Sequence, residues 1–143
     1  MEIVKYPNKI LEKKAKKVKE PLDSNIQKIV KDMLVLMDEA NGAGLAAPQV
    51  GELLRICTIR CDGETFVLIN PKITSYSREK EIEEEGCLSF PGKFIPIKRS
   101  TKVKARFVDE KGNETKIKAE GLLARVIQHE VDHLNGILFI NRK

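Results

Sequence analysis

The last part of the chain contains side chains that could bind a metal ion and catalyse hydrolysis. His129 and His133 are the only histidines, and they flank Glu130 in the sequence HEVDH (residues 129–133). Four residues advance a helix by about 400°, so both imidazoles face one way, ~6 Å apart along the axis, and can share one metal ion. Glu130 lies ~100° further round, within reach of a metal-bound water. The motif predicts a catalytic metal site; the alternative is two histidines four apart by chance.

A third protein ligand would have to come from upstream of this motif. Residues 134–143 contain no His, Asp, Glu or Cys. Cys57 and Cys61 lie in a β-like run with apolar neighbours, which is typical of buried, unreactive thiols. Cys87 instead follows Gly86 at the end of an acidic run, where the chain can turn toward a site. The spacing favours Cys87 without excluding the other cysteines or an acidic residue.

A tract of small residues, GAGLAAPQ (residues 42–49), is a third candidate element. It lacks the features of a phosphate-binding loop, because no strand precedes it, no helix opens from it and no Walker-type lysine follows. Small side chains allow a ligand or a neighbouring strand to approach the backbone closely. Gln49 adds an amide donor at the end of the tract. The alternative is a plain turn between a helix and a strand, with Gln49 on the surface.

The pattern of the chain predicts two helices separated by strands. Residues 24–40 have helical periodicity, with Ser24 and Gln27 as a capping box and Asn41-Gly42 as the stop. A second helix over residues 122–134 carries the histidines and ends at Asn135-Gly136. Between them, β-rich runs separated by turn signals predict strands: LLRICTI (53–59), TFVLINPKI (65–73) and TKVKARFV (101–108). Without βαβ alternation, we expect one α+β domain over residues 1–143, with antiparallel sheets around the C-terminal helix and an N-terminal helix.

Composition narrows the class of protein. The chain has 143 residues, of which 41% are hydrophobic and 33% charged, a balance typical of one soluble domain. No apolar run approaches the ~18 residues of a membrane span, and the N-terminus does not resemble a secretory signal, so we expect a cytoplasmic protein with reduced thiols and no membrane partner.

Residues 1–20 hold seven Lys against three Glu and supply +4 of the net charge of +5. A solvated basic face is the favoured interpretation, and a weak attraction to a polyanion such as a ribosome is the alternative. Because aromatic residues are few, no specific nucleic-acid partner is expected.

Three of these segments together resemble the signature motifs of the peptide deformylase family. They are GAGLAAPQ (42–49), EGCLS (85–89) and QHEVDHLNG (128–136), in the family's order and spacing. The opening VKYPNKILEKKAKKV (4–18) is similar to the family's N-terminal segment, so the resemblance covers nearly the whole chain. It implies an enzyme that removes the N-formyl group from formyl-methionyl nascent peptides and releases formate.

The resemblance also implies a metal centre and a mechanism. The family's ligands correspond to Cys87, His129 and His133, which leave a fourth position for water. Fe(II) is the usual ion, and Zn, Ni or Co can occupy the same site; the sequence chemistry alone would have favoured Zn. Glu130 corresponds to the general acid/base for the metal-bound water that attacks the formyl carbon. The remaining catalytic groups, the donors to the oxyanion, are the side chain of Gln49 and the backbone N–H of Leu88.

Substrate contacts can be carried over in the same way. The small residues Ala43, Gly44 and Gly86 would let the substrate peptide bind as an additional β-strand. Leu122 and Val126 correspond to the wall of the methionine pocket, and core packing is the alternative for each. The family varies at the position of Arg125, so we assign no substrate contact to this residue. Asp132, between the two histidines, is a candidate for orienting a ligand histidine or a nearby arginine.

The segment after the second helix bears on the partners of the protein. Many bacterial members carry a C-terminal extension that in some helps docking on the ribosome, whereas this chain continues for ten residues beyond His133. We therefore expect only transient ribosome contact. Separately, we expect the protein to be a monomer. A metal amidase acting on another acyl group is one rival, and a non-enzymatic metal- or RNA-binding module is another. Glu130 and Gln49 argue against the second, because a purely structural metal site closes its fourth position with protein.

Overall fold

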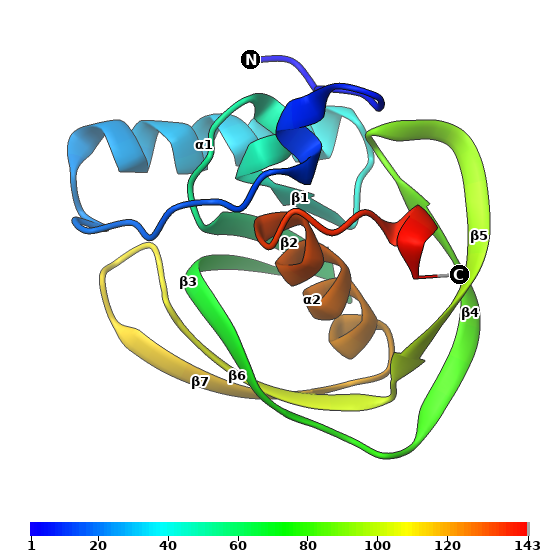
Figure 1. Cartoon of the computed structure of the whole chain (residues 1–143). Coiled ribbons are helices and arrows are strands. Elements are labelled where there is room, and N and C mark those ends of the chain that lie inside the picture. The colour runs from blue at the N-terminus through cyan, green and yellow to red at the C-terminus, as the bar shows by residue number, and fades with distance from the viewer. Residues whose placement is uncertain (143) are drawn as a thin grey trace.

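The segment that carries both histidines forms helix α2 (Gly121–Leu134), which lies in the middle of the structure with strands around it (Figure 1). The computed structural model describes residues 1–142. The remaining elements, in chain order, are the 3₁₀ helix η1 (Lys9–Glu12), α1 (Ser24–Glu39), β1 (Gly44–Ala46), the 3₁₀ helix η2 (Ala47–Val50), β2 (Ile56–Cys61), β3 (Glu64–Tyr76), β4 (Lys80–Cys87), β5 (Phe90–Ser100), β6 (Lys102–Val108), β7 (Glu114–Glu120) and the 3₁₀ helix η3 (Phe139–Asn141).

The strands form two sheets. The larger has five strands in the order β1-β2-β3-β6-β7, and the smaller is the hairpin of β4 and β5. Every pair of neighbouring strands is antiparallel. The expected α+β class, with antiparallel sheets around a C-terminal helix and with an N-terminal helix, is confirmed.

The two helices lie on opposite faces of the main sheet. The apolar face of α1 packs on one side, where Ile29, Met33 and Met37 meet Val67 and Ile69 of β3. The other face of the sheet packs against α2. Full burial of one such apolar side chain contributes about 1.5–3 kcal/mol. Among the described residues, no helix has both the length and the apolar character that crossing a bilayer would require.

Both predicted helices exist, but the first one starts differently. Its N-cap is Asp23, whose side chain accepts a hydrogen bond from the Asn25 backbone N at 2.8 Å. The predicted capping box of Ser24 and Gln27 is wrong: Ser24 is already helical, and the Gln27 amide donates to the carbonyl oxygen of Pro21 at 2.8 Å. Aspartate competes well for this position, because a carboxylate also interacts favourably with the helix N-terminus.

The strand pattern was only partly predictable. Strands β2, β3 and β6 overlap the three predicted runs, although β2 begins three residues later than its run, whereas β1, β4, β5 and β7 were not expected. In β4 the sequence is KEIEEEGC, and its charges resemble a solvated loop more than a strand. Its pairing with β5, from Lys80↔Ser100 to Cys87↔Phe90, supplies the order that local propensity lacks. The register shifts at Gly86, one residue before Cys87.

Candidate metal centre and active site

Three potential metal ligands meet where the end of β4 faces α2. The ligand atoms of Cys87, His129 and His133 all lie within 4.8 Å of one another. Cys87 Sγ is 3.3 Å from His133 Nε2, and the two imidazole rings are 5.0 Å apart between centroids. The structure thus brings together a thiol and two histidines that are more than 40 positions apart in sequence. Cys57 and Cys61 are buried in the core between α2 and the sheet, as expected of unreactive thiols.

The donor set fits a divalent transition ion. One thiolate and two imidazoles suit a tetrahedral site whose fourth position remains open. Two buried side-chain atoms in the described part of the chain have no hydrogen-bond partner, and both belong to this site: Glu130 Oε1 and His133 Nδ1. A buried polar atom without a partner is unusual in native proteins. The orphaned oxygen of Glu130, beside the ligand cluster, is therefore the arrangement expected where a bound ion and its water complete the site.

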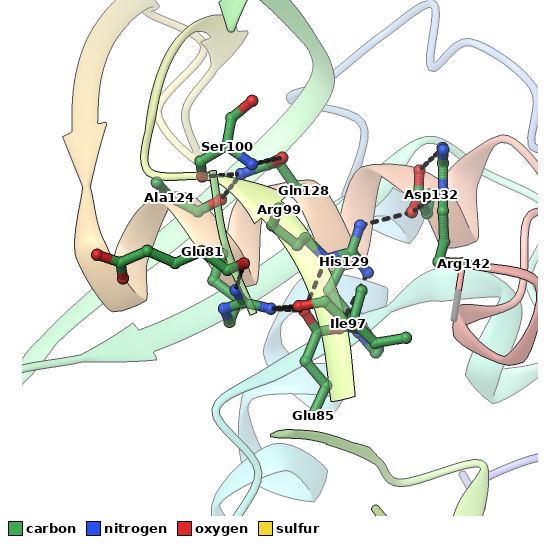
Figure 2. A network of polar contacts seen from close by, with 11 residues as sticks. Glu81, Glu85, Ile97, Arg99, Ser100, Ala124, Gln128, His129, Asp132 and Arg142 are labelled. Atoms are coloured by element: carbon green, nitrogen blue, oxygen red, sulfur yellow. Dashed lines mark hydrogen bonds and ion pairs between the residues drawn. The ribbon is translucent and has the colours of Figure 1, made fainter. Parts of the chain in front are cut away.

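A carboxylate from β4 orients the first histidine. Glu85 Oε1 lies 2.8 Å from His129 Nδ1, so that Nε2 of the ring is left for the cluster (Figure 2). Burial of Glu85 raises the pKa of its carboxyl, but hydrogen bonds from His129 and Arg99 outweigh burial and lower that pKa to about 2. Burial of His129 lowers the pKa of its ring, but contacts with Cys87 and Glu85 outweigh it and raise that pKa to about 10. A metal ion bound through Nε2 would have to displace this proton, because a ligand imidazole is neutral.

An arginine behind Glu85 connects it to the end of α2. Arg99 of β5, 5% exposed, donates from Nε and Nη2 to the two carboxylate oxygens of Glu85 at 2.7 and 2.9 Å. Its Nη1 donates to Asp132 Oδ2 at 2.8 Å, and Arg142 donates to Asp132 Oδ1 at 2.9 Å (Figure 2). Asp132 thus holds arginines rather than a ligand histidine, which is one of the two roles considered for it.

Arg125 ties α2 to both strands of the hairpin. Its Nη1 donates to Glu85 Oε2 at 2.6 Å and to the carbonyl oxygen of Ile97 at 2.9 Å. Its Nη2 donates to the carbonyl oxygen of Glu81 at 2.8 Å. Further along the helix, the side-chain amide of Gln128 pairs with the backbone N and O of Ser100. The hairpin is therefore fixed to α2 by polar contacts along its length.

Glu130 is 4% exposed and lies against the backbone of β1. Burial raises the pKa of its carboxyl to about 7, although the positive charges of His129 and Arg99 oppose the shift. A Cβ placed on Gly44 would lie 2.4 Å from Glu130 Oε2, which is impossible without movement. A glycine at position 44 is therefore required for Glu130 to occupy this position.

The amide of Gln49 is also fixed in place, at 1% exposure. Its Oε1 accepts a hydrogen bond from Ala46 N at 2.9 Å, which assigns Nε2 as the group that faces the site. Nε2 donates to Ser89 Oγ at 3.1 Å and lies 3.6 Å from Cys87 Sγ. Ser89 Oγ in turn donates to the carbonyl oxygen of Val4 at 2.7 Å. Gln49 is thus buried in the site rather than placed on the surface.

A cavity of about 570 Å³ opens beside these groups. It is lined by nearly all of the predicted site residues: Ala43, Gly44, Gln49, Gly86, Cys87, Leu88, Val126, His129 and Glu130. His133 contributes to the cluster from behind the cavity wall, at 1% exposure. Leu122 is 57% exposed and is not among the lining residues, so its place in the methionine pocket stays a prediction.

Sequence reasoning missed the residues that support the site. Glu85, Ser89 and Arg99 were not named as functional, although two of them lie inside the EGCLS segment. Their position within two residues of Cys87 was the one available signal for Glu85 and Ser89. The sequence gives no such signal for Arg99, because only the pairing of β4 with β5 brings it beside Glu85.

Comparisons with known proteins agree with this geometry. The family model described as polypeptide deformylase matches residues 1–143. A peptide deformylase of Clostridium botulinum (strain Alaska E43 / Type E3) is 50% identical over 140 residues, covering 98% of this chain and 94% of the relative. The crystal structure of peptide deformylase from Thermotoga maritima has a TM-score of 0.95 at 40% identity, over 99% of this chain and 95% of that one. The peptide deformylase from Ehrlichia chaffeensis in complex with actinonin has a TM-score of 0.96 at 41% identity, over 99% and 87% of the two chains. On sequence, fold and near-complete coverage alike, this chain belongs to the polypeptide deformylase family.

Proposed function

We propose that this chain hydrolyses the N-formyl group of formyl-methionyl nascent peptides and releases formate, using a divalent ion held by Cys87, His129 and His133. The observation that carries the proposal is the buried carboxylate of Glu130, whose unpaired oxygen lies beside the three ligands at a cavity. The names of the relatives, all peptide deformylases, support the choice of reaction. Fe(II) is the ion proposed for the cell, with Zn, Ni or Co able to take its place. Bound there, the ion would lower the pKa of water toward ~7, as zinc does in the best-known case.

Glu130 is the proposed general base and then the general acid. Its carboxylate takes a proton from the attacking water as the C–O bond forms, and delivers that proton to the amine nitrogen as the C–N bond breaks. The products are formate and a free amino terminus. A pKa raised by burial to about 7 suits this exchange, because a group that titrates near the working pH can both accept and donate a proton.

The oxyanion donors are Gln49 Nε2 and the backbone N–H of Leu88. Both residues line the cavity, and the Gln49 amide is held by Ala46 and Ser89 before any substrate arrives. Preorganised donors stabilise the developing negative charge without reorganising at the moment of reaction. Loss of one such donor typically lowers turnover by about 10²–10³-fold.

The substrate backbone would lie between β1 and the end of β4. Strand β1 is at the edge of the main sheet, so its outer side is open to a further strand. Ala43 and Gly44, which come at the start of β1, and Gly86, near the end of β4, all line the cavity. Val126, on the turn of α2 before His129, lines the cavity and would contact the methionine side chain.

The first test is formate release from a formyl-Met tripeptide by protein purified without oxygen, with metal content measured on the same sample. We expect about one ion per chain and rapid release. Cys87→Ser should lose both, whereas Cys61→Ser, a matched change at a thiol outside the site, should keep both. Glu130→Ala should keep its metal and lose at least ~10²-fold in turnover.

Other results would reject parts of the proposal. Equal hydrolysis of acetyl-Met and formyl-Met peptides would indicate a broader amidase. One ion per chain with no hydrolysis of either would keep the metal site and reject the reaction. Full activity in Glu130→Ala would mean that another residue is the base. Actinonin, the compound bound to the Ehrlichia chaffeensis relative, provides a check on the site, because it should block release by the active protein.

A further inference from the structure

A group of cations occupies the face of the main sheet that points away from α2. It consists of Lys72 on β3, Lys104 and Arg106 on β6, and Lys116 and Lys118 on β7, all exposed; we call this group the cationic face. The residues that alternate with them on β6 and β7, such as Ala105 and Ala119, are buried against α2. Because side chains alternate between the two faces of a strand, the cations share the outer face.

The cations lie directly opposite one another across the strands. Lys72 pairs with Arg106, Arg106 pairs with Lys116, and Lys104 pairs with Lys118. Neighbouring strands are ~4.8 Å apart and alternate residues on a strand are ~7 Å apart, so the five charges form a dense two-row array. Like charges directly opposite each other destabilise a sheet. An array that works against folding points to a role outside folding.

Acidic side chains offset this array only in part, because Glu114 and Glu120, exposed on the same face of β7, stand at its two ends against five cations. In the part of the chain that the structure describes, the ion pair on these strands joins Lys102 to Glu120 at 3.9 Å, at the end of the face. By contrast, Lys28 on α1 has its partner Asp32 one turn away, at 2.9 Å. The cationic face therefore keeps its positive potential.

The face is also open to a large partner. In Figure 1, α2 lies on the inner side of β6 and β7, and among the described helices only α1 approaches their outer side, at Val108 at the end of β6. The basic N-terminal segment runs along one border, since the Val18 backbone exchanges two hydrogen bonds of 2.8 Å with the side chain of Asn70 on β3. The exposed Lys17 and Lys19 flank Val18. Asn70, the partner of Val18, is two positions from Lys72 in the sequence of β3. The positive charge of the segment thus adds to that of the face.

We propose that the cationic face binds the sugar-phosphate backbone of double-helical RNA without reading its sequence. A flat array of flexible cations suits regularly spaced phosphates, which dominate such binding. Strands β6 and β7 present no aromatic side chain on the outer face, and single-stranded bases need aromatic platforms for stacking. The choice of RNA over DNA rests on the proposed function, because nascent peptides are made on an RNA-rich particle.

Protection of the sheet edge explains only part of the array. Strand β7 is at the edge, and lysines on an edge strand discourage pairing with another sheet. That role accounts for Lys116 and Lys118. It does not account for Lys72, Lys104 and Arg106, which lie on the two strands inside the edge.

The test measures binding of a fluorescently labelled 20-base-pair RNA hairpin by anisotropy at 50, 100 and 200 mM KCl. The face variant combines Lys104→Gln, Arg106→Gln and Lys118→Gln. The control variant combines Lys31→Gln, Lys80→Gln and Lys98→Gln, three exposed lysines outside the face and the N-terminal segment that give the same net charge. We expect wild type to bind with a steep salt dependence, and the face variant to lose at least ~10-fold in affinity at 100 mM. Its slope of log K against log salt should fall by about 2–3, since each phosphate contact contributes ~0.9. The control should stay within about twofold of wild type.

Several outcomes would overturn the proposal. The first is an equal loss of RNA affinity in the face and control variants, which would indicate an effect of net charge rather than a site. The second is a face variant that binds the hairpin with wild-type affinity. A third is a face that binds phosphatidylglycerol vesicles but not the hairpin, which would indicate a membrane surface. Formate release should be unchanged in the face variant. RNA binding can therefore fail while deformylation succeeds, or the reverse, so that the two proposals are tested separately.

Discussion

Helices α1 and α2 each bury one face against the same sheet, but they bury different kinds of side chain. The buried residues of α1 are all apolar: Ile26, Ile29, Val30, Met33 and Met37. The buried residues of α2 include five polar or charged ones: Gln128, His129, Glu130, Asp132 and His133. Burying a charge is unfavourable unless it is paired and hydrogen-bonded. The burial of α2 therefore needs an explanation that the burial of α1 does not.

The explanation is the β4–β5 hairpin, which contacts α2 and has no counterpart beside α1. Glu85 and Arg99 enter from this hairpin and provide the partners of His129 and Asp132. The main sheet alone offers α2 an apolar surface. The second sheet therefore supplies the hydrogen bonds that make burial of His129 and Asp132 possible, whereas Glu130 and His133 each keep one unpaired atom at the site.

The largest effect should follow from removal of the central arginine. Arg99→Met leaves Glu85 and Asp132 without their main partner in a buried site, and we expect unfolding free energy to fall by about 3–5 kcal/mol. The measurement is urea denaturation. The matched change on α1 is Lys28→Met, which breaks the exposed pair with Asp32 and should lower stability by only about 0.3–0.5 kcal/mol.

The pH dependence of the same variant separates charge from shape. The folded-state pKa of Glu85, about 2, is below its ordinary value of 4.5, so its network contributes stability above pH 4.5 that is lost as pH falls toward 2. Because Arg99→Met removes the part of that contribution that comes from Arg99, beside the part from His129, the gap in stability between variant and wild type should narrow over this pH range. A gap that is constant with pH would mean that Arg99 acts by packing alone.

A smaller effect should follow from adding a methyl group to Gly44 on β1. It should raise the activation free energy of the reaction and leave the stability of the fold nearly unchanged. In Gly44→Ala the new Cβ would meet the buried carboxylate of Glu130 at 2.4 Å, so the carboxylate would have to move away from its present position. We expect turnover to fall by about 10²-fold or more with metal content unchanged, which is the size of effect that loss of acid/base help produces. In Gly86→Ala the Cβ instead meets the ring of Phe94, which is 65% exposed and can move, so the loss should be smaller. Equal losses would show that substrate contact rather than the position of Glu130 explains both glycines.

The same contrast explains which features the sequence revealed. Both helices could be predicted because their apolar periodicity is local, and the HEVDH spacing alone indicates that two histidines share one helical face. The choice of Cys87 could not be completed from spacing. It depended on the resemblance of EGCLS to a family motif, and the structure then placed the thiol beside His133.

The unpredicted features depend on pairing between distant segments. Strand β4 is rich in glutamate, and only its register with β5 shows that Glu85 points inward while its neighbours stay exposed. Arg99 meets Glu85 from 14 positions away, and Arg142 meets Asp132 from the end of the described chain. No periodicity within one element records such contacts, because each partner is supplied by another element.

The smallest effect should come from the outer end of the polar network. Arg142 donates to Asp132 from Nη2 at 2.9 Å and from Nε at 3.1 Å, but its side chain is 46% exposed. Asp132 keeps its buried partner Arg99 when Arg142 is removed. We therefore expect Arg142→Ala to lower stability by no more than ~1 kcal/mol and to leave turnover unchanged. Urea denaturation and formate release on one preparation provide the check. A loss as large as that of Arg99→Met would mean that the network is cooperative out to the surface, and that the burial of α2 depends on the whole chain of contacts rather than on the hairpin alone.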